Sequence, residues 1–368
     1  MYRGEQKDVH FTEGYDLRQR LAGRPIGSNT LRFVLVRLLI GGLLLTLCPG
    51  CGGGKTPSSA PRNTPSNTPA KSAQPAKPAK LVLGQPLLAA CSAAANGKVY
   101  IFGGMDSKGK DVADVLEIDP SAGTIAKRAG MPTPRNSAQA VAVGDKIVLV
   151  GGRNAGGMVT SVEIYDPAKN AWEKAGKMDA PVWMHMAAAI GSKVYVMGGI
   201  SATGSARTST SAVKILDMKS GTWSNGPDLP AARQGASVGV AWNKIYLFGG
   251  RLGGASTSGE ATDTVIVLDT GTEKWTGAKK MPATRTSGQS AVIGEKAYIV
   301  GGAARGQVTK ATDVYDFAAD SWSTGPSLKT ARSGHCIGYA GNRIYVIGGA
   351  SGSSVESAMK EIEVVEIK

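Results

Sequence analysis

The residues best suited to bind an anion are four arginines that recur at one position of a repeated pattern. Each lies sixteen residues before a pair of consecutive glycines, and they are Arg135, Arg233, Arg285 and Arg332. Two other repeats have Leu87 and Val182 at this place, and Trp183 follows the latter. A guanidinium presents a planar fork that matches a carboxylate or sulfate. If the fold gathers these side chains around one mouth of a channel, we predict an anion site with Trp183 beside it. The alternative is that each arginine pairs with a neighbouring acid as part of the scaffold.

Two histidines and two cysteines also repeat. His185 and His335 each lie thirteen residues before a glycine pair, and Cys91 and Cys336 each lie twelve residues before one. The histidines are predicted to face each other across the channel, as ligand contacts or as simple lining. The cysteines have no CxxC or HxxxH neighbours, so we predict no metal and no cofactor. They are expected to be either a disulfide, which export permits, or buried free thiols.

The element that must position these residues is a short strand ending in a glycine pair, such as residues 193–199. It occurs six times, and the first glycines are 48, 47, 51, 52 and 47 residues apart. Around each pair lie runs of four to seven β-branched or small apolar residues bounded by turn residues, which predicts a four-stranded antiparallel meander. Such sheets arranged radially protect their edges. The sequence therefore predicts an all-β propeller of six blades over residues 81–368.

Four units add an apolar or aromatic residue followed by aspartate, with a tryptophan seven residues after the first member. These pairs are Tyr165-Asp166, Leu216-Asp217, Leu268-Asp269 and Tyr315-Asp316, and the tryptophans are Trp172, Trp223, Trp275 and Trp322. With the glycine pairs, this pattern resembles the Kelch repeat. The resemblance implies a six-bladed ring closed by strands from both termini. Because the last unit ends after its third strand, residues 81–83 are predicted to complete that blade. The glycines are predicted to allow close backbone approach, and the tryptophans to pack between blades.

The resemblance to Kelch propellers implies a binding scaffold more readily than an enzyme. No nucleophile elbow, zinc signature, carboxylate dyad or nucleotide fingerprint occurs at a fixed spacing. The alternative is an enzyme similar to the periplasmic Kelch propellers that interconvert sialic-acid anomers. In that case the arginines would hold the sugar carboxylate, and an acid such as Glu260 would move the proton.

The first 80 residues differ in composition from the rest. They hold 12 of the 42 Lys and Arg but 4 of the 28 Asp and Glu, so the repeat region carries 30 basic against 24 acidic residues. This modest excess does not predict a nucleic-acid partner. Residues 52–80 contain six prolines among small polar residues, which predicts a disordered tether.

Residues 1–51 are predicted to be a leader. A basic flank precedes ten mostly apolar residues at 38–47, too few to span a bilayer and typical of a secretory signal. Gly50-Cys51 then resembles a bacterial lipoprotein processing site, which implies lipidation of Cys51. We therefore expect an exported, lipid-anchored monomer at the cell envelope, in the periplasm or outer membrane. Its expected partner is a protein or a cell-envelope glycan, and its only contact with the membrane is the anchor.

Overall fold

The structure is a computed structural model, and it describes residues 81–203, 206–254 and 258–367. The chain divides into two units, residues 1–71 and 72–368, and every described residue belongs to the second. The predicted signal core at 38–47, Cys51 and the tether at 52–80 lie outside the described residues. Within the described part of the chain, no helix is long and apolar enough to cross a membrane.

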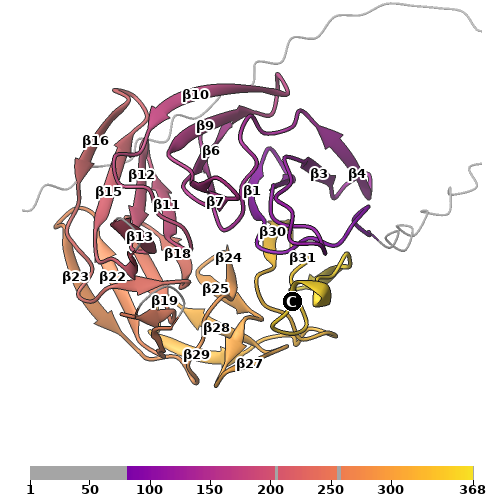
Figure 1. Cartoon of the computed structure of the whole chain (residues 1–368). Helices are drawn as coiled ribbons and strands as arrows, with labels where there is room; N and C mark the ends of the chain where they lie inside the picture. The colour runs from indigo at the N-terminus through magenta and orange to yellow at the C-terminus, as the bar shows by residue number, and fades with distance from the viewer. Residues whose placement is uncertain (1–80, 204–205, 255–257, 368) are drawn as a thin grey trace, which may run out of the picture. The chain divides into compact units, whose positions relative to one another are not determined.

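Six antiparallel sheets follow one another along the chain and are numbered here as sheets 1 to 6 (Figure 1). Sheet 1 comprises β1 (Cys91–Ala95), β2 (Lys98–Phe102), β3 (Val115–Asp119) and β4 (Thr124–Arg128). Sheet 2 comprises β5 (Gln139–Val143), β6 (Lys146–Val150), β9 (Ser161–Asp166) and β10 (Ala171–Lys177). Sheet 3 comprises β11 (Met186–Ile190), β12 (Lys193–Met197), β15 (Val213–Asp217) and β16 (Thr222–Asn225).

Sheets 4 and 5 repeat this plan, and sheet 6 has three strands. Sheet 4 comprises β18 (Ser237–Ala241), β19 (Lys244–Phe248), β22 (Val265–Asp269) and β23 (Lys274–Ala278). Sheet 5 comprises β24 (Gln289–Ile293), β25 (Lys296–Val300), β28 (Thr312–Asp316) and β29 (Ser321–Thr324). Sheet 6 comprises β30 (Cys336–Ala340), β31 (Arg343–Ile347) and β32 (Ile362–Glu366). This all-β architecture of antiparallel sheets is that of a β-propeller, as the repeats predicted.

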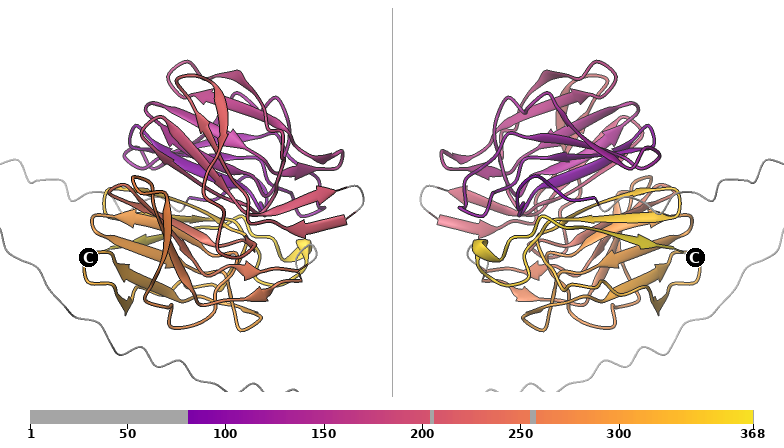
Figure 2. Two further views of the ribbon diagram at one scale, coloured as in Figure 1. Left: turned by 90° about the vertical axis from the view of Figure 1, so that its left-hand side faces the viewer. Right: turned by 90° about the vertical axis from the view of Figure 1, so that its right-hand side faces the viewer.

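The connections between second and third strands carry the remaining elements, with one exception. They are the hairpins β7 (Arg153–Asn154) with β8 (Gly157–Met158), β13 (Ile200–Thr203) with β14 (Ala206–Ser209) and β26 (Ala303–Ala304) with β27 (Gln307–Val308), the short sheet of β17 (Arg233–Gln234), β20 (Arg251–Leu252) and β21 (Glu260–Ala261), and the 3₁₀ helix η1 (Val355–Ser357). The exception is β17, which precedes the first strand of sheet 4 and pairs with β20. We call the side of the domain that carries these elements the loop face. Figure 2 shows β13–β14 projecting from the same side as η1.

The strands form because the second strand of each sheet is apolar on both faces, so that both faces can be buried. The second strand of every sheet is buried along its last four residues, as in the pattern of β6, Lys-Ile-Val-Leu-Val. Each apolar cluster combines residues of two neighbouring sheets, so the core lies between the sheets. Tryptophans complete these interfaces: the indole N–H of Trp172 donates to the carbonyl of Ala129 in the preceding sheet at 2.9 Å. Trp275 and Trp322 make the same bond, so the predicted packing role of these three side chains is confirmed.

Two series of backbone hydrogen bonds connect neighbouring sheets. In the first, a residue with positive φ two positions before each innermost strand donates its N–H to the matching carbonyl of the preceding sheet, at 2.8–3.3 Å; these residues are Ala89, Ser137, Met184, Gly235, Ser287 and Gly334. The N–H of Ala89 donates to the carbonyl of Gly334, so the series also joins sheet 1 to sheet 6.

In the second series, the N–H of the second glycine of each pair donates to a carbonyl of the following sheet at 2.7–2.9 Å. Gly104 donates to Arg135, and the last donor, Gly349, returns to Leu87. Both glycines of the pair have positive φ, and a Cβ on Gly104 would lie 2.8 Å from the carbonyl oxygen of Leu88. The predicted role of the glycine pairs in close backbone approach is therefore confirmed.

Residues 81–83 lie against sheet 6, but as an isolated bridge and not as a complete fourth strand. Val82 pairs with Glu361, and the N–H of Leu83 donates to the carbonyl of Lys360 at 2.9 Å. The side chains of Leu81 and Leu83 are buried in a cluster that contains Val99 of sheet 1 and Tyr345 of sheet 6. This segment therefore joins the apolar core between the two terminal sheets.

The buried position of Leu83 predicts a loss of stability when its side chain is shortened. We expect Leu83→Ala to lower the free energy of unfolding by about 2–5 kcal/mol, because it leaves a cavity between sheets 1 and 6. The exposed Gln85 in the same segment is the matched control, and Gln85→Ala should change the stability by less than about 0.5 kcal/mol. Urea unfolding of the full chain measures both. Equal effects of the two substitutions would show that the segment does not contribute to the core.

Candidate functional site

The four arginines of the predicted crown are buried inside their own sheets. Their relative exposure is 1–3%, so the structure does not display them at the mouth of a channel. Arg135 donates to the carbonyls of Gly151 and Ser161, and its guanidinium lies 2.8 Å from the carboxylate of Glu163. The guanidinium therefore fixes the glycine pair to the beginning of the third strand.

Arg285 and Arg332 are held in the same way. Arg285 pairs with Asp313 and donates to the carbonyl of Gly301 at 2.7 Å. Arg332 lies 3.5 Å from Glu363 and donates to the carbonyl of Gly348 at 3.0 Å. The arrangement of these three side chains is the scaffold alternative, in which each arginine pairs with a neighbouring acid.

Arg233 differs because Ile266 takes the place of the acid. Its guanidinium donates to the carbonyl of Gly249 and, at 2.8 Å, to the hydroxyl of Thr264. Burial without a nearby carboxylate lowers the pKa of Arg233 to about 10. Register explains the difference: Ile266 pairs with Leu247 in sheet 4, just as Asp313 pairs with Ile299 in sheet 5.

Trp183 is also buried, at 6% exposure, and its ring is already covered. The guanidinium carbon of Arg153 lies 4.3 Å from the ring centroid, a cation–π contact. The backbone of Trp183 pairs with Ile200 on the loop face. The ring therefore supports Arg153 and is not open for stacking on a ligand.

The two histidines line one hollow, as the repeat positions predicted. We call it the axial hollow: a cavity of about 380 Å³ whose lining comes from the starts of the innermost strands of all six sheets and from Met105 and Ser353 on the loop face. His185 and His335 both belong to its lining, although each is only 1% exposed. A Cβ on Gly301 would lie 2.8 Å from Cε1 of His335, so this ring packs against the preceding sheet.

Both imidazoles are neutral. Among the described residues neither ring nitrogen of His185 has a hydrogen-bond partner. Burial lowers the pKa of His185 to about 3, and burial together with the charge of Arg332 lowers that of His335 to about 3. A histidine of this kind is a poor general base, because it has no carboxylate to orient or stabilise its protonated form.

Sequence reasoning missed the glutamines of the hollow. Gln139 and Gln289 are the first residues of β5 and β24, and both line the axial hollow and a second cavity of about 150 Å³ that adjoins it. Their equivalent positions on the innermost strands were the available signal. The other side chains of the axial hollow are small, aliphatic or sulfur-containing, and its lining includes no Asp, Glu, Lys or Arg among the described residues.

The remaining candidates do not assemble into a reactive site. Cys91 and Cys336 are free thiols in different apolar clusters, and burial raises the pKa of each to about 12. Glu260 lies on β21 with its side chain exposed and is not part of the axial hollow. In the described ranges no three His, Cys, Asp or Glu side chains gather as a possible metal site.

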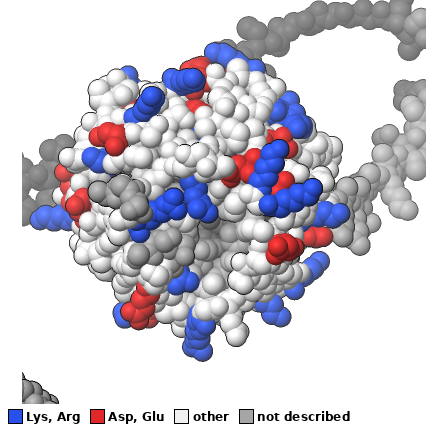
Figure 3. Space-filling model, viewed as in Figure 1, with Lys and Arg blue, Asp and Glu red and all other residues white. Residues whose placement is uncertain are grey.

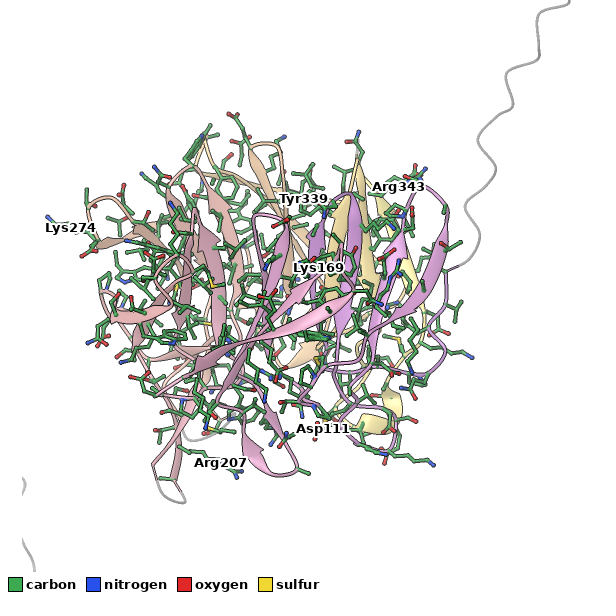
Figure 4. The ribbon with its side chains drawn as sticks, turned by 90° about the horizontal axis from the view of Figure 1, so that it is seen from above. Asp111, Lys169, Arg207, Lys274, Tyr339 and Arg343 are labelled. Atoms are coloured by element: carbon green, nitrogen blue, oxygen red, sulfur yellow. The ribbon has the colours of Figure 1, made fainter. Side chains whose placement is uncertain are left out.

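Basic side chains lie beside the hollow on the loop face, and acidic side chains lie among them (Figure 3). Figure 3 views this face and shows Lys and Arg beside a central depression. The side view in Figure 4 places Arg207 and Asp111 on the loop face and Tyr339, Arg343 and Lys274 on the opposite face. The connections between second and third strands carry Arg153, Arg207, Arg251 and Arg305 in sheets 2 to 5.

Fold and site together define a repeat propeller with a recessed axial hollow under variable loops. The chain belongs to the Attractin/LZTR1 beta-propeller family, whose model matches residues 99–359. It is also similar to Kelch-like protein terF of Aspergillus terreus (strain NIH 2624 / FGSC A1156), with 35% identity over 103 residues. That match covers 27% of this chain and 22% of the relative. These comparisons support the predicted Kelch-type propeller.

The paired and unpaired arginines predict different costs of substitution. Arg135→Met should lower the free energy of unfolding by about 3–5 kcal/mol, because it leaves the fully buried Glu163 without a countercharge. Arg233→Met leaves no such carboxylate and should cost clearly less. Urea unfolding at neutral pH compares the two variants. The double variant Arg135→Met, Glu163→Leu should recover part of the loss; equal losses for Arg135→Met and Arg233→Met would contradict the assigned role of Glu163.

The histidines predict a decrease in stability at mildly acidic pH. Their folded-state pKa values lie below the ordinary value of about 6.5, so the unfolded chain binds more protons between about pH 6.5 and pH 3. Stability should therefore fall as the pH is lowered, by up to about 1.4 kcal/mol per pH unit for each histidine. Urea unfolding between pH 7 and pH 5 measures the slope. His335→Met should remove about half of it, and an unchanged slope would show that this ring is not buried in its neutral form.

Proposed function

We propose that this protein is a non-enzymatic interaction scaffold that binds a protein partner on its loop face, at the mouth of the axial hollow. The observation that carries the proposal is the chemistry of the hollow. Its lining offers amide, hydroxyl, thioether and neutral imidazole groups, and no charged acid–base pair among the described residues. Such a site can bind groups of a partner, but it is poorly equipped to move protons.

The scaffold we propose is a closed ring of six blades. Support comes from the two hydrogen-bond series, each of which has six members and returns from sheet 6 to sheet 1. The pairing of Val82 with Glu361 further supports closure by the N-terminal segment. A closed ring would keep the loop-face hairpins at fixed positions around the hollow, which lowers the entropy cost of binding.

The arginines on the connections of sheets 2, 3 and 5 favour an acidic protein segment as the partner. Arg207 and Arg305 are exposed and lie on the hairpins of sheets 3 and 5. Arg153 lies on the hairpin of sheet 2 and packs over the ring of Trp183. The connections of sheets 1, 4 and 6 carry acids such as Asp111, Glu260 and Glu356 beside their basic residues. Membership of a Kelch-like propeller family fits a protein partner. A cell-envelope glycan is the competing partner, and the experiment below distinguishes the two.

We further propose that the domain acts as a monomer at the cell envelope, held by a lipid on Cys51. The support is the sequence alone: the apolar run at 38–47, Gly50-Cys51 and the proline-rich residues 52–80. A tether of 29 residues in an extended form would reach on the order of 90 Å, which lets the loop face search for a partner away from the membrane.

Charge reversal on the two faces tests the binding surface. The variant Arg207→Glu, Arg305→Glu changes the loop face, and Arg343→Glu, Lys274→Glu makes the same charge change on the opposite face (Figure 4). In crosslinked pull-downs from envelope extract, we expect the first variant to lose its captured proteins and the second to keep them. Digestion of the extract with protease should abolish capture, whereas persistence after protease would identify a glycan.

The same assay separates anchoring from binding. Cys51→Ser should move the full chain from the membrane fraction to the soluble fraction and leave capture unchanged. Equal capture by both charge-reversed variants would overturn the proposed loop-face surface. A membrane fraction unaffected by Cys51→Ser would overturn the proposed anchor.

A further inference from the structure

Sheets 1 and 3 are the two sheets without the buried arginine, and each has a cavity in its place. The cavity of sheet 1 measures about 280 Å³, and its lining includes Leu83, Leu87, Ile101, Gly103, Asp114 and Leu116. Leu87 occupies the arginine position and Leu116 the position of Glu163, since Leu116 pairs with Ile101 as Glu163 pairs with Leu149. We call this cavity the blade-1 pocket. A water takes about 30 Å³ of liquid volume, so the pocket has room for a larger group.

The four buried arginines show which group the surrounding backbone can bind. In each of their sheets the guanidinium donates to the carbonyl of the first glycine of the pair. It also donates to the carbonyl at the start of the third strand, as Arg285 does to Ala311 at 3.2 Å. In sheet 1 the corresponding carbonyls belong to Gly103 and Asp114, and no described side chain donates to either.

The walls and mouth of the blade-1 pocket suit an alkylguanidinium. Leu83, Leu87 and Ile101 supply a buried apolar floor for the alkyl chain. At the mouth, the carboxylate of Asp114 is 38% exposed and lies 2.8 Å from Nζ of Lys127, which is 69% exposed. An exposed pair of this kind contributes little to stability, so an incoming cation can displace the lysine.

We propose that the blade-1 pocket binds the arginine side chain of a protein partner. The guanidinium donates to the carbonyls of Gly103 and Asp114 and pairs with the carboxylate of Asp114, while its alkyl chain lies on the leucines. The incoming side chain thus takes the place that Arg135 occupies in sheet 2. This site is separate from the axial hollow, and a small-molecule probe reports on it whether or not the loop face captures a protein.

The cavity of sheet 3 provides an internal comparison. It measures about 300 Å³ and has Val182 at the arginine position. Lys214 occupies the position of the acid, because it pairs with Val196 as Asp313 pairs with Ile299. Asp179, 71% exposed, lies 4.0 Å from Nζ of Lys214. The ammonium of Lys214 is bound by the side-chain oxygen of Asn225 at 2.7 Å. Ala212 stands where sheet 1 has Asp114, two residues before the position of the acid. The sheet 3 cavity therefore lacks the carboxylate that pairs with the guanidinium in the blade-1 pocket, and it should not bind the probe.

The test uses the full chain and N-butylguanidinium, with the neutral N-butylurea as the matched probe. Isothermal titration should give saturable one-site binding of N-butylguanidinium, and N-butylurea should bind about tenfold more weakly or not at all, because it lacks the charge that strengthens the hydrogen bonds. Leu87→Arg supplies the missing side chain from within and should abolish binding. Val182→Arg fills the cavity of sheet 3 and should leave the affinity unchanged.

Two conservative variants keep the test decisive if Leu87→Arg fails to fold. Asp114→Asn should weaken binding about tenfold, since hydrogen bonds to a charged partner are stronger than neutral ones. Lys127→Met removes the competing cation and should strengthen binding several-fold. No saturable binding, equal binding of both probes, or loss of binding in Val182→Arg but not in Asp114→Asn would overturn the proposal.

Discussion

Contact between the two terminal sheets is the constraint on which the rest of the structure depends. Both series of backbone hydrogen bonds contribute to this contact in the same way. Each uses residues with positive φ, and each includes a hydrogen bond between sheet 6 and sheet 1. The cost of a left-handed backbone is small for glycine but larger for Ala89, Ser137, Met184 and Ser287, which also adopt it. The structure tolerates this cost because every one of these residues gains an intersheet hydrogen bond. At these positions the backbone conformation is therefore the main constraint, and it also sets the direction of the side chain.

This constraint explains the different fates of the candidate residues. The arginine position precedes the innermost strand and contributes its carbonyl to the second series, so its side chain lies between the glycine pair and the third strand, where it is buried. The histidine position follows the first series directly, and its ring lies beside the axial hollow. The arginine is therefore part of the scaffold, and the histidine three residues later is part of the lining of the hollow.

Much of the fold could be predicted from the sequence, because each repeat carries its own turn signals, apolar strands and glycine pair. Asn96-Gly97, for example, forms the tight turn between β1 and β2 with φ values of 52° and 72°. The grouping of His185 with His335 around one hollow could also be predicted, since equivalent repeat positions face one axis. The burial of the arginines could not, because spacing fixes the position of a Cα along the strand but not the direction of a long side chain. The acids that receive it, such as Glu163 and Asp313, lie on the third strand, where no fixed residue type marked them.

Departures from the repeat are where this chain carries information beyond its fold. Sheet 3 replaces the arginine and the acid by Val182 and Lys214, and sheet 1 replaces them by Leu87 and Leu116. In both cases a cavity opens where packing alone would favour a filled core.

The turn of β18–β19 shows the same kind of departure from the repeat. It places Trp242 at φ 54° with 61% of the residue exposed, where the other sheets have asparagine or glycine. A bulky side chain in a left-handed conformation is costly, and the edge contact with Phe317 at 6.2 Å offsets only part of that cost. Since the sheets otherwise satisfy the same packing rules, a sheet that breaks them shows which part of the domain is shaped by something other than its own stability.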